Sequence, residues 1–140
     1  MRDRELTLGN VRVLVVEDDP NNRIVISRLL RLAGVTQDRF FETDGDAAAF
    51  LRESAAEVDI VFLDLQLPRK DGYKILAELR ENVTTAGLLV VALTANVMKQ
   101  DIERCRKAGF DGFIGKPIDG RRFSEILGKI LAGESVWTIA

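Results

Sequence analysis

The sequence predicts an α/β domain built on a doubly wound, five-stranded parallel sheet with five helices. Short apolar runs rich in β-branched residues alternate with longer segments of helical periodicity, in units of roughly 20–25 residues. The 140 residues, 46% hydrophobic and 30% charged, suit one folded domain. Because the crossovers between parallel strands are right-handed, we expect helices on both faces and the carboxyl ends of all strands at one edge.

The first unit begins with a buried strand over residues 11–16 and continues with a helix over 20–33. Asp19 is expected to cap this helix, since it stands before a proline whose missing N–H is not needed in the first turn. Gly34 is expected to end the helix. The side chains expected on its inward face are those of Val25, Leu29 and Leu32.

The second and third units continue the alternation. A weaker strand over 39–43 is expected at an edge of the sheet, followed by a short helix. The third strand, over 59–64, has four apolar central residues, which suits a strand covered on both faces. The next helix is expected to run from about Gly72 to about Arg80. The inward residues expected in these two helices are Ala47, Phe50 and Leu51, then Ile75, Leu76 and Leu79.

The last two units repeat the pattern. A strand over 88–93 precedes a helix that Asn96 is expected to cap and that continues to about Ala108. A short strand over 112–115 precedes a final helix that Asp119 is expected to cap. Apolar residues in that helix follow the i, i+3, i+4, i+7, i+8 rule. They are Phe123, Ile126, Leu127, Ile130 and Leu131.

Composition excludes several classes of function. The net charge of −2 and the lack of a basic stripe predict no direct DNA binding. No run approaches the roughly 18 apolar residues of a membrane span, and the leader over 1–10 lacks the core of a secretory signal, so the cytoplasm is the expected compartment. The absence of histidine excludes Ser-His and Cys-His catalysis and nearly all common zinc sites. Cys105 is expected to be a small buried hydrophobe rather than a catalytic thiol.

Asp64 stands at the carboxyl end of the central strand, where open α/β folds place their ligands. An acid directly after a buried strand often caps the next helix. Here Pro68 and Gly72 delay that helix, so it begins too far along the chain for Asp64 to cap it. We therefore identify Asp64 as the candidate reactive residue.

Chemically useful side chains follow four of the predicted strands and are expected to meet at one edge. Three carboxylates roughly 5 Å apart would repel each other by about 3 kcal/mol per pair at an effective dielectric near 20, so the cluster requires a cation. Hard oxygen ligands favour Mg²⁺ with one position open for a phosphate oxygen. Together with an ammonium and a hydroxyl, the set suits phosphoryl transfer to a carboxylate nucleophile. Its members are Glu17, Asp18, Asp64, Thr94 and Lys116.

From about Val11 to Leu131 the chain resembles the receiver domain of bacterial two-component response regulators. The matching motifs are Val15-Val16-Glu17-Asp18-Asp19, Leu63-Asp64, the Pro68 to Asp71-Gly72 loop, Ala92-Leu93-Thr94-Ala95 and Lys116-Pro117. The resemblance implies a flavodoxin-like fold with strand order 2-1-3-4-5. It also implies a leader over 1–10, a receiver domain over 11–132 and a tail over 133–140, and a phosphoacceptor signalling domain rather than an enzyme.

By this resemblance Asp64 takes a phosphoryl group from a phosphohistidine on a sensor histidine kinase or a histidine phosphotransfer protein. Asp18, Asp64 and the backbone carbonyl of Gln66 would hold Mg²⁺, with Glu17 acting largely through water. Lys116 would bind a phosphate oxygen.

The resemblance also implies a switch. Thr94 would close on a second phosphate oxygen, and Phe113 would turn inward as Thr94 moves, remodelling the face made by the fourth helix, fifth strand and fifth helix. That face would bind a downstream protein or a second copy of the chain. Ala95 belongs to the same motif as Thr94, and the bond before Pro117 is expected to be cis. Spacing alone fits an alternative to this switch role, in which Phe113 is an ordinary core aromatic.

Two other functions fit parts of the pattern. A Mg²⁺-dependent phosphatase can also form an aspartyl phosphate, but such enzymes have an Asp-x-Asp pattern and this chain has Gln66 at the second position. A receiver-like module could instead bind partners without being phosphorylated, although all the chemical residues are present here.

The residues after Leu131 are too few for an output domain, so we expect a stand-alone receiver or a piece of a longer protein. Residues 136–139 contain the single tryptophan and alternate apolar with polar side chains. They are expected either to rest on their own domain or to contact a partner.

Overall fold

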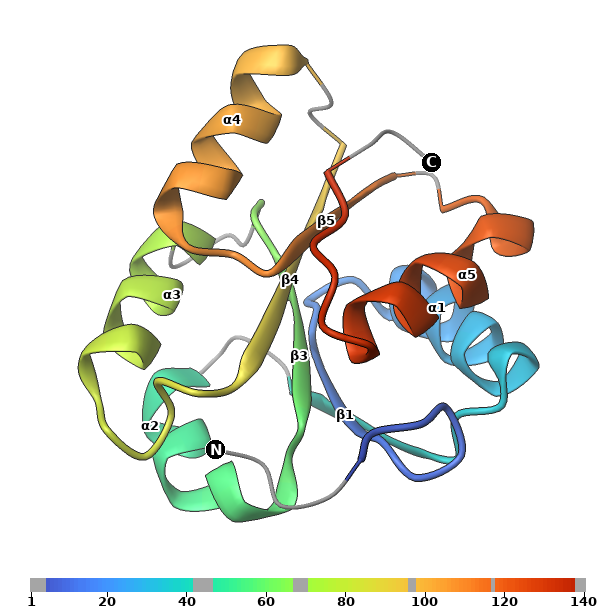
Figure 1. Ribbon diagram of the computed structural model, residues 1–140, viewed down its shortest axis with the longest axis horizontal. Helices are drawn as coiled ribbons and strands as arrows, with labels where there is room; N and C mark the ends of the chain where they lie inside the picture. The colour runs from blue at the N-terminus through green and yellow to red at the C-terminus, as the bar shows by residue number, and fades with distance from the viewer. Residues whose placement is uncertain (1–4, 42–46, 67–70, 96–97, 117, 138–140) are drawn as a thin grey trace.

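Five parallel strands form one sheet in the order β2-β1-β3-β4-β5, which confirms the predicted fold (Figure 1). The computed structural model describes residues 5–41, 47–66, 71–95, 98–116 and 118–137. The strands are β1 (Arg12–Val16), β2 (Gln37–Phe41), β3 (Ile60–Asp64), β4 (Leu89–Thr94) and β5 (Gly112–Gly115). The helices are α1 (Pro20–Ala33), α2 (Ala47–Ser54), α3 (Gly72–Glu81), α4 (Lys99–Ala108) and α5 (Gly120–Leu131), with a short 3₁₀ turn, η1 (Ala55–Glu57), after α2.

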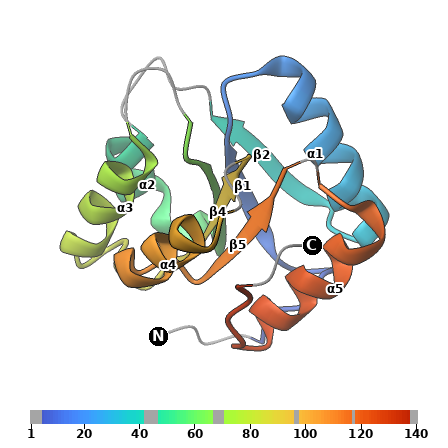
Figure 2. The same cartoon turned by 90° about the horizontal axis from the view of Figure 1, so that it is seen from above.

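The helices form a layer on each face of the sheet, as the right-handed crossovers require. Figure 2 shows α1 and α5 on one side and α2, α3 and α4 on the other. Alternate side chains of the central strands enter two separate cores: Leu14 and Val61 face α2 and α3, whereas Val15 and Phe62 face α1 and α5. The central strands β1, β3 and β4 are mainly apolar because both faces of the sheet are covered there. No helix in the described ranges is long and apolar enough to cross a membrane.

The inward face predicted for α1 is wrong by about one residue. Val25 is 50% exposed and Leu32 is 85% exposed, whereas Ile26 and Leu30 are buried against the sheet. Leu29 lies between these two sets and packs at the border of the core. The pattern misled because apolar residues stand side by side along α1, so periodicity alone does not fix which of them point inward.

Most of the predicted helix ends are confirmed. The Asp19 carboxylate accepts a hydrogen bond from the Asn21 N–H at 2.9 Å, and Asp119 caps α5 in the same way at 3.0 Å. Gly34 ends α1 with a φ of 105°, a left-handed conformation that strongly favours glycine. Helix α4 begins later than predicted, with Met98 at the N-cap position and no side-chain cap; the predicted cap, Asn96, lies outside the described residues.

Helices α3 and α4 are joined by a hydrogen bond between the Tyr73 hydroxyl and Cys105 Sγ, 3.3 Å apart. Cys105 is fully buried, as predicted. Burial raises the pKa of the Cys105 thiol above its ordinary value. Burial and the contact with Cys105 together raise the pKa of the Tyr73 hydroxyl. Both groups therefore hold their protons more tightly in the folded chain than in the unfolded one.

We expect the free energy of unfolding to fall as the pH rises above about 8, where unfolded cysteine, with a pKa of about 8.5, begins to ionise. Each group's contribution to the free energy of unfolding is complete below its unfolded pKa and is lost as the pH rises through its folded pKa. Between these two pKa values the free energy of unfolding falls by up to about 1.4 kcal/mol per pH unit for each group. Urea unfolding at pH 7, 9 and 10 should show a shallower fall in a Tyr73→Phe, Cys105→Ala variant. Parallel profiles for variant and wild type would contradict this account.

Candidate functional site

The register of the sheet brings the ends of four strands to one edge. Val16 pairs with Leu63, so the residue after β1 lies beside Asp64 at the end of β3. Asp64 pairs in turn with Leu93, and Thr94 at the end of β4 pairs with Gly115. Because all the strands are parallel, the side chains that follow them emerge at the same rim.

Two buried carboxylates at this rim share one ammonium group. Lys116 Nζ lies 2.9 Å from Asp64 Oδ2 and 3.2 Å from Glu17 Oε1. The Glu17 and Asp64 side chains are only 2% and 5% exposed, whereas that of Lys116 is 19% exposed. The lysine therefore neutralises charge that would otherwise be buried without a partner.

The electrostatics of the cluster follow from burial and from its mutual contacts. Burial and the nearby Asp64 raise the pKa of Glu17, although the Asp19 N–H and Lys116 partly oppose this. Burial alone would lower the pKa of Lys116, but the hydrogen bonds and charges of Asp64 and Glu17 outweigh it and raise that pKa. Lys116 is thus a fixed positive charge at neutral pH, and the carboxylates gain from any further cation.

Gln66 links the candidate nucleophile to the threonine. Its backbone N–H donates to Asp64 Oδ1 at 2.9 Å, and its side-chain Nε2 donates to Thr94 Oγ1 at 2.9 Å. Thr94 is 1% exposed. The sequence analysis assigned the backbone carbonyl of Gln66 to the metal and missed this side-chain contact. The position of Gln66 just beyond β3, next to the end of β4, could have predicted its contact with Thr94.

The loop between β1 and α1 is held by contacts that the sequence did not predict. Arg23 Nη1 donates to the carbonyl oxygens of Glu17 and Asp18 at 3.0 and 3.1 Å. Glu17 Oε2 accepts from the Asp19 N–H at 3.1 Å. Glu17 therefore shapes its own loop as well as facing Asp64.

Asp64 has no helix to cap, as predicted, because Asp71 caps α3 by accepting from the Tyr73 N–H at 2.8 Å. The helix begins close to the candidate nucleophile. A Cβ atom at Gly72 would lie 3.1 Å from the carbonyl oxygen of Asp64 and 2.9 Å from a Leu65 methyl carbon. Glycine at this position therefore lets α3 approach the rim.

The structure thus joins Glu17, Asp64 and Lys116 directly and connects Thr94 to them through Gln66. Asp18 is half-buried beside them, but across the described ranges no three acidic, histidine or cysteine side chains form a ready metal-binding group.

The remaining predicted residues surround this cluster. The Ala95 N–H lies at the limit of hydrogen bonding, 3.5 Å from Gln66 Oε1. Phe113 is 0% exposed and belongs to the core beneath α3 and α4, as expected for an ordinary core aromatic; its role as a switch stays a prediction. Pro117 lies outside the described residues.

The donor set at the rim nevertheless fits Mg²⁺. This ion is usually held by one or two carboxylates together with waters and substrate phosphate oxygens, so three acids are not required. Glu17 and Asp64 supply two buried carboxylates that already face one cationic group, and each gains from added positive charge.

Comparison with known proteins gives a consistent result. Residues 13–128 match the family model described as the response regulator receiver domain. Over 122 residues the chain is 36% identical to hybrid signal transduction histidine kinase L of Dictyostelium discoideum, covering 84% of this chain and 7% of that protein. It is 33% identical to the two-component response regulator ORR41 of Oryza sativa subsp. japonica, covering 85% of this chain and 93% of that one. The chain therefore spans a small part of the hybrid kinase.

Solved structures agree with the fold. The receiver domain of sensor histidine kinase PA1611 from Pseudomonas aeruginosa PAO1 superposes with a TM-score of 0.68 at 30% identity, covering 87% of this chain and 98% of that one. That receiver domain was crystallised with a magnesium ion coordinated in its active site cleft. Chemotaxis protein CheY4 of Vibrio cholerae, at 20% identity and a TM-score of 0.74, shares the fold over 86% of this chain and 98% of that one.

Proposed function

Because the chain belongs to the response regulator receiver domain family, we propose that it accepts a phosphoryl group from phosphohistidine onto Asp64 and thereby switches a protein-binding face. Receiver domains partner with histidine kinases or phosphotransfer proteins, and the hybrid kinase and rice regulator above are relatives from such signalling systems. The observation that carries the proposal is the contact of Asp64 with Lys116 at a rim where Glu17 and Thr94 also emerge.

The proposed reaction is an in-line displacement. A carboxylate oxygen of Asp64 attacks phosphorus, the bond from phosphorus to the donor imidazole nitrogen breaks, and that nitrogen keeps the electron pair. Lys116 already contacts Asp64 Oδ2 and can follow the incoming phosphoryl oxygens with its fixed charge. The hydroxyl of Thr94 can donate to another of these oxygens once it turns from Gln66.

We assign Mg²⁺ to the carboxylates of Asp18 and Asp64 and the backbone carbonyl of Gln66, with Glu17 acting largely through water. When bound, the ion neutralises negative charge on the transferring phosphoryl oxygens. This chain's own groups then position the acceptor: the Gln66 N–H fixes Asp64 Oδ1, and Lys116 fixes Oδ2.

The proposal is tested by incubating the chain with acetyl phosphate, with and without Mg²⁺, and measuring bound phosphoryl. We expect about one hydroxylamine-sensitive phosphoryl group per chain, formed only with Mg²⁺. Many turnovers of a phosphomonoester would instead favour the phosphatase. No incorporation and no response to beryllofluoride would favour a module that works without phosphorylation.

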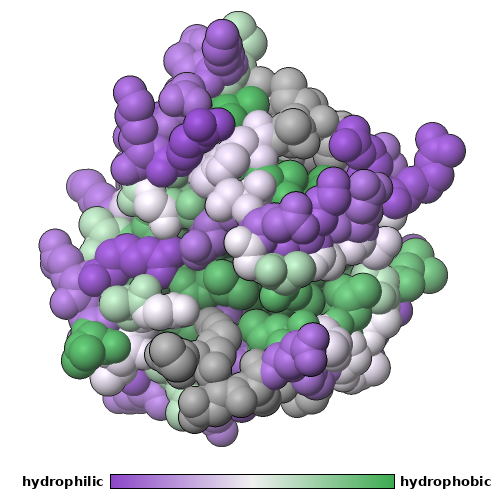
Figure 3. All heavy atoms as spheres, in the orientation of Figure 1, coloured by the Kyte–Doolittle hydropathy of each residue, from purple (hydrophilic) through white to green (hydrophobic). Residues whose placement is uncertain are grey.

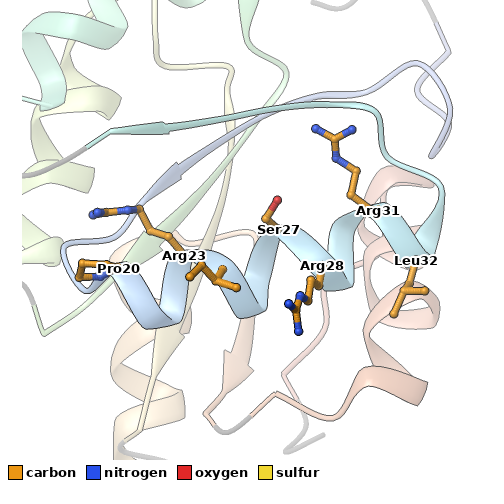
Figure 4. A pocket seen from close by; sticks show the side chains of 7 residues that line it. Pro20, Arg23, Ser27, Arg28, Arg31 and Leu32 are labelled. Carbon is orange, nitrogen blue, oxygen red and sulfur yellow. The ribbon is translucent and has the colours of Figure 1, made fainter.

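A groove along α1 is the proposed docking site for the donor protein (Figure 4). It is lined by the apolar Ile24 and Leu32, by Ser27, and by three arginines, Arg23, Arg28 and Arg31. Figure 3 shows hydrophobic groups at the surface on the side where α1 and α5 lie. Helix α1 has no acidic residue and starts directly beyond the Asp64 rim, so it suits an apolar helix with acidic flanks that carries the phosphohistidine.

Replacing Ile24 with serine should slow transfer from a phosphohistidine protein by about tenfold, as expected when roughly 1.4 kcal/mol of docking contact is lost. Ile24 is 55% exposed, so the fold should be unaffected. Transfer from acetyl phosphate, which needs no docking, should keep its rate. Val83→Ser is the matched control, since Val83 is 92% exposed and lies far along the chain, after α3. Equal slowing with both donors would contradict the docking role.

The output is proposed to pass through the face made by α4, β5 and α5. Phosphorylation would draw Thr94 towards Asp64, and β5 would follow because the Lys116 N–H donates to the Thr94 carbonyl at 2.8 Å. This face would bind a downstream protein or a second copy of the chain. Phe113 lies on β5 and is already fully buried beneath α4, so its burial cannot increase when the face changes.

A further inference from the structure

Residues 134–137 turn back after α5 and lie along the outer edge of β5 (Figure 1). Val136 forms a parallel bridge with Gly112, and the Phe113 N–H donates to the Val136 carbonyl at 3.0 Å. Val136 is 9% exposed. Strand β5 is the last in the sheet order, so this segment satisfies part of an edge that is otherwise open to another chain.

Trp137 extends this contact towards α4. Its ring packs against the core that contains Phe113, and the Arg106 guanidinium of α4 lies 5.8 Å from the ring centre. The segment therefore follows α5, pairs with β5 and contacts α4. These are the three elements of the proposed output face.

Strand β5 connects the segment to the phosphorylation site. Near its start, Phe113 donates to Val136, and directly after its end, Lys116 contacts Asp64 and Glu17. Lys116 is the fourth residue after Gly112, which corresponds to about 13 Å of extended chain. A shift of Lys116 towards a phosphoryl group can therefore reach Val136 through one short, fully buried strand.

We propose that residues 134–137 are a self-docked strand that covers the β5 edge in the unphosphorylated domain, and that phosphorylation of Asp64 releases them so that the output partner can bind there. Because residues 134–137 occupy the edge, the partner is expected to resemble them. It would be an extended segment with an apolar residue followed by an aromatic one, paired in parallel with β5. This inference rests on the proposed function, because it requires a phosphoryl group on Asp64.

The coupling between the two sites is reciprocal. If phosphorylation weakens docking of the segment by some factor, then removing the docked side chains strengthens binding of a phosphoryl analogue by up to the same factor. The proposal can therefore be tested from either end.

Trp137 is the only tryptophan, so its emission and its quenching by acrylamide report the docked segment directly. We expect phosphorylation with acetyl phosphate and Mg²⁺ to shift the emission to longer wavelength and to increase quenching. Asp64→Asn should abolish both changes. Bound phosphoryl is measured in the same samples. Full incorporation with unchanged or reduced quenching would overturn this inference alone, whereas no incorporation would overturn both it and the proposed function.

The second test uses a Val136→Ser, Trp137→Ser variant and calorimetric titration with beryllofluoride and Mg²⁺. We expect binding at least about fivefold tighter than in wild type, the lower end of typical couplings between sites. Ser135→Ala, an exposed change in the same segment, is the matched control and should bind as wild type does. Trp137→Leu, which keeps an apolar side chain, replaces the double variant if that variant does not fold. Unchanged or weaker affinity would overturn the inference.

Discussion

An Asp64→Asn variant is expected to accept no phosphoryl group from any donor. Asparagine keeps the size of the side chain and an oxygen that can accept from the Gln66 N–H, but it lacks the carboxylate that must attack phosphorus. Incorporation from acetyl phosphate and from a phosphohistidine protein should both fall to background. The measurement is bound phosphoryl per chain after removal of the donor.

The fold of this variant should persist. Lys116 keeps Glu17 as a partner at 3.2 Å, and the pKa of Glu17 should decrease because the charge of Asp64 is one of the causes that raise it. The matched control is Asp71→Asn, since asparagine caps a helix as well as aspartate does and the Asp71 carboxylate accepts from the Tyr73 N–H at the start of α3. Full incorporation in Asp64→Asn would refute Asp64 as the acceptor.

Replacing Lys116 with methionine should have the largest effect on stability. The change leaves Glu17 and Asp64 buried and facing each other without their shared ammonium. Breaking a buried pair typically costs 3–5 kcal/mol, and the partial exposure of Lys116 reduces this to about 2–3 kcal/mol. Urea unfolding without Mg²⁺ at pH 7 measures the loss, and phosphoryl acceptance should fall with it.

The pH dependence of the stability loss in Lys116→Met provides the control for this prediction. Lys116 lowers the pKa of Glu17, so its removal raises that pKa further above the unfolded value. A carboxyl group whose pKa is higher in the folded than in the unfolded chain stabilises the fold fully below its unfolded pKa. This stabilisation is lost as the pH rises through its folded pKa. The deficit of Lys116→Met should therefore be small near pH 4.5 and largest near neutrality, and Mg²⁺ should reduce it. A deficit independent of both pH and Mg²⁺ would point to lost packing of the lysine stem instead.

The fold could be predicted because its signals are strong and local. Strands β1, β3 and β4 are apolar runs that end at or just before a polar residue, and most helices begin at an acid and end at a glycine or near one. The convergence of Glu17, Asp64, Thr94 and Lys116 followed from topology alone, since parallel strands end at one edge. Residues far apart in the chain were thus placed together without knowledge of any side-chain conformation.

The details that failed depend on tertiary packing. The inward face of α1 was misplaced because Ile24, Val25 and Ile26 are consecutive apolar residues, and only the shape of the sheet and α5 selects Ile26. The contacts of Gln66 with Thr94 and of Arg23 with the β1–α1 loop involve long polar side chains. Their partners depend on rotamers and on neighbouring strands, which periodicity does not report.

The most direct test of the account is to identify the phosphorylated residue. The chain is phosphorylated with acetyl phosphate and Mg²⁺, the acyl phosphate is reduced with borohydride to a stable alcohol, and the digested peptides are sequenced by mass spectrometry. We predict homoserine at position 64 and at no other aspartate, and none in a sample treated without Mg²⁺. Modification spread over exposed acids such as Asp71, with position 64 unchanged, would contradict the claim that these strand ends form a phosphoryl-accepting site.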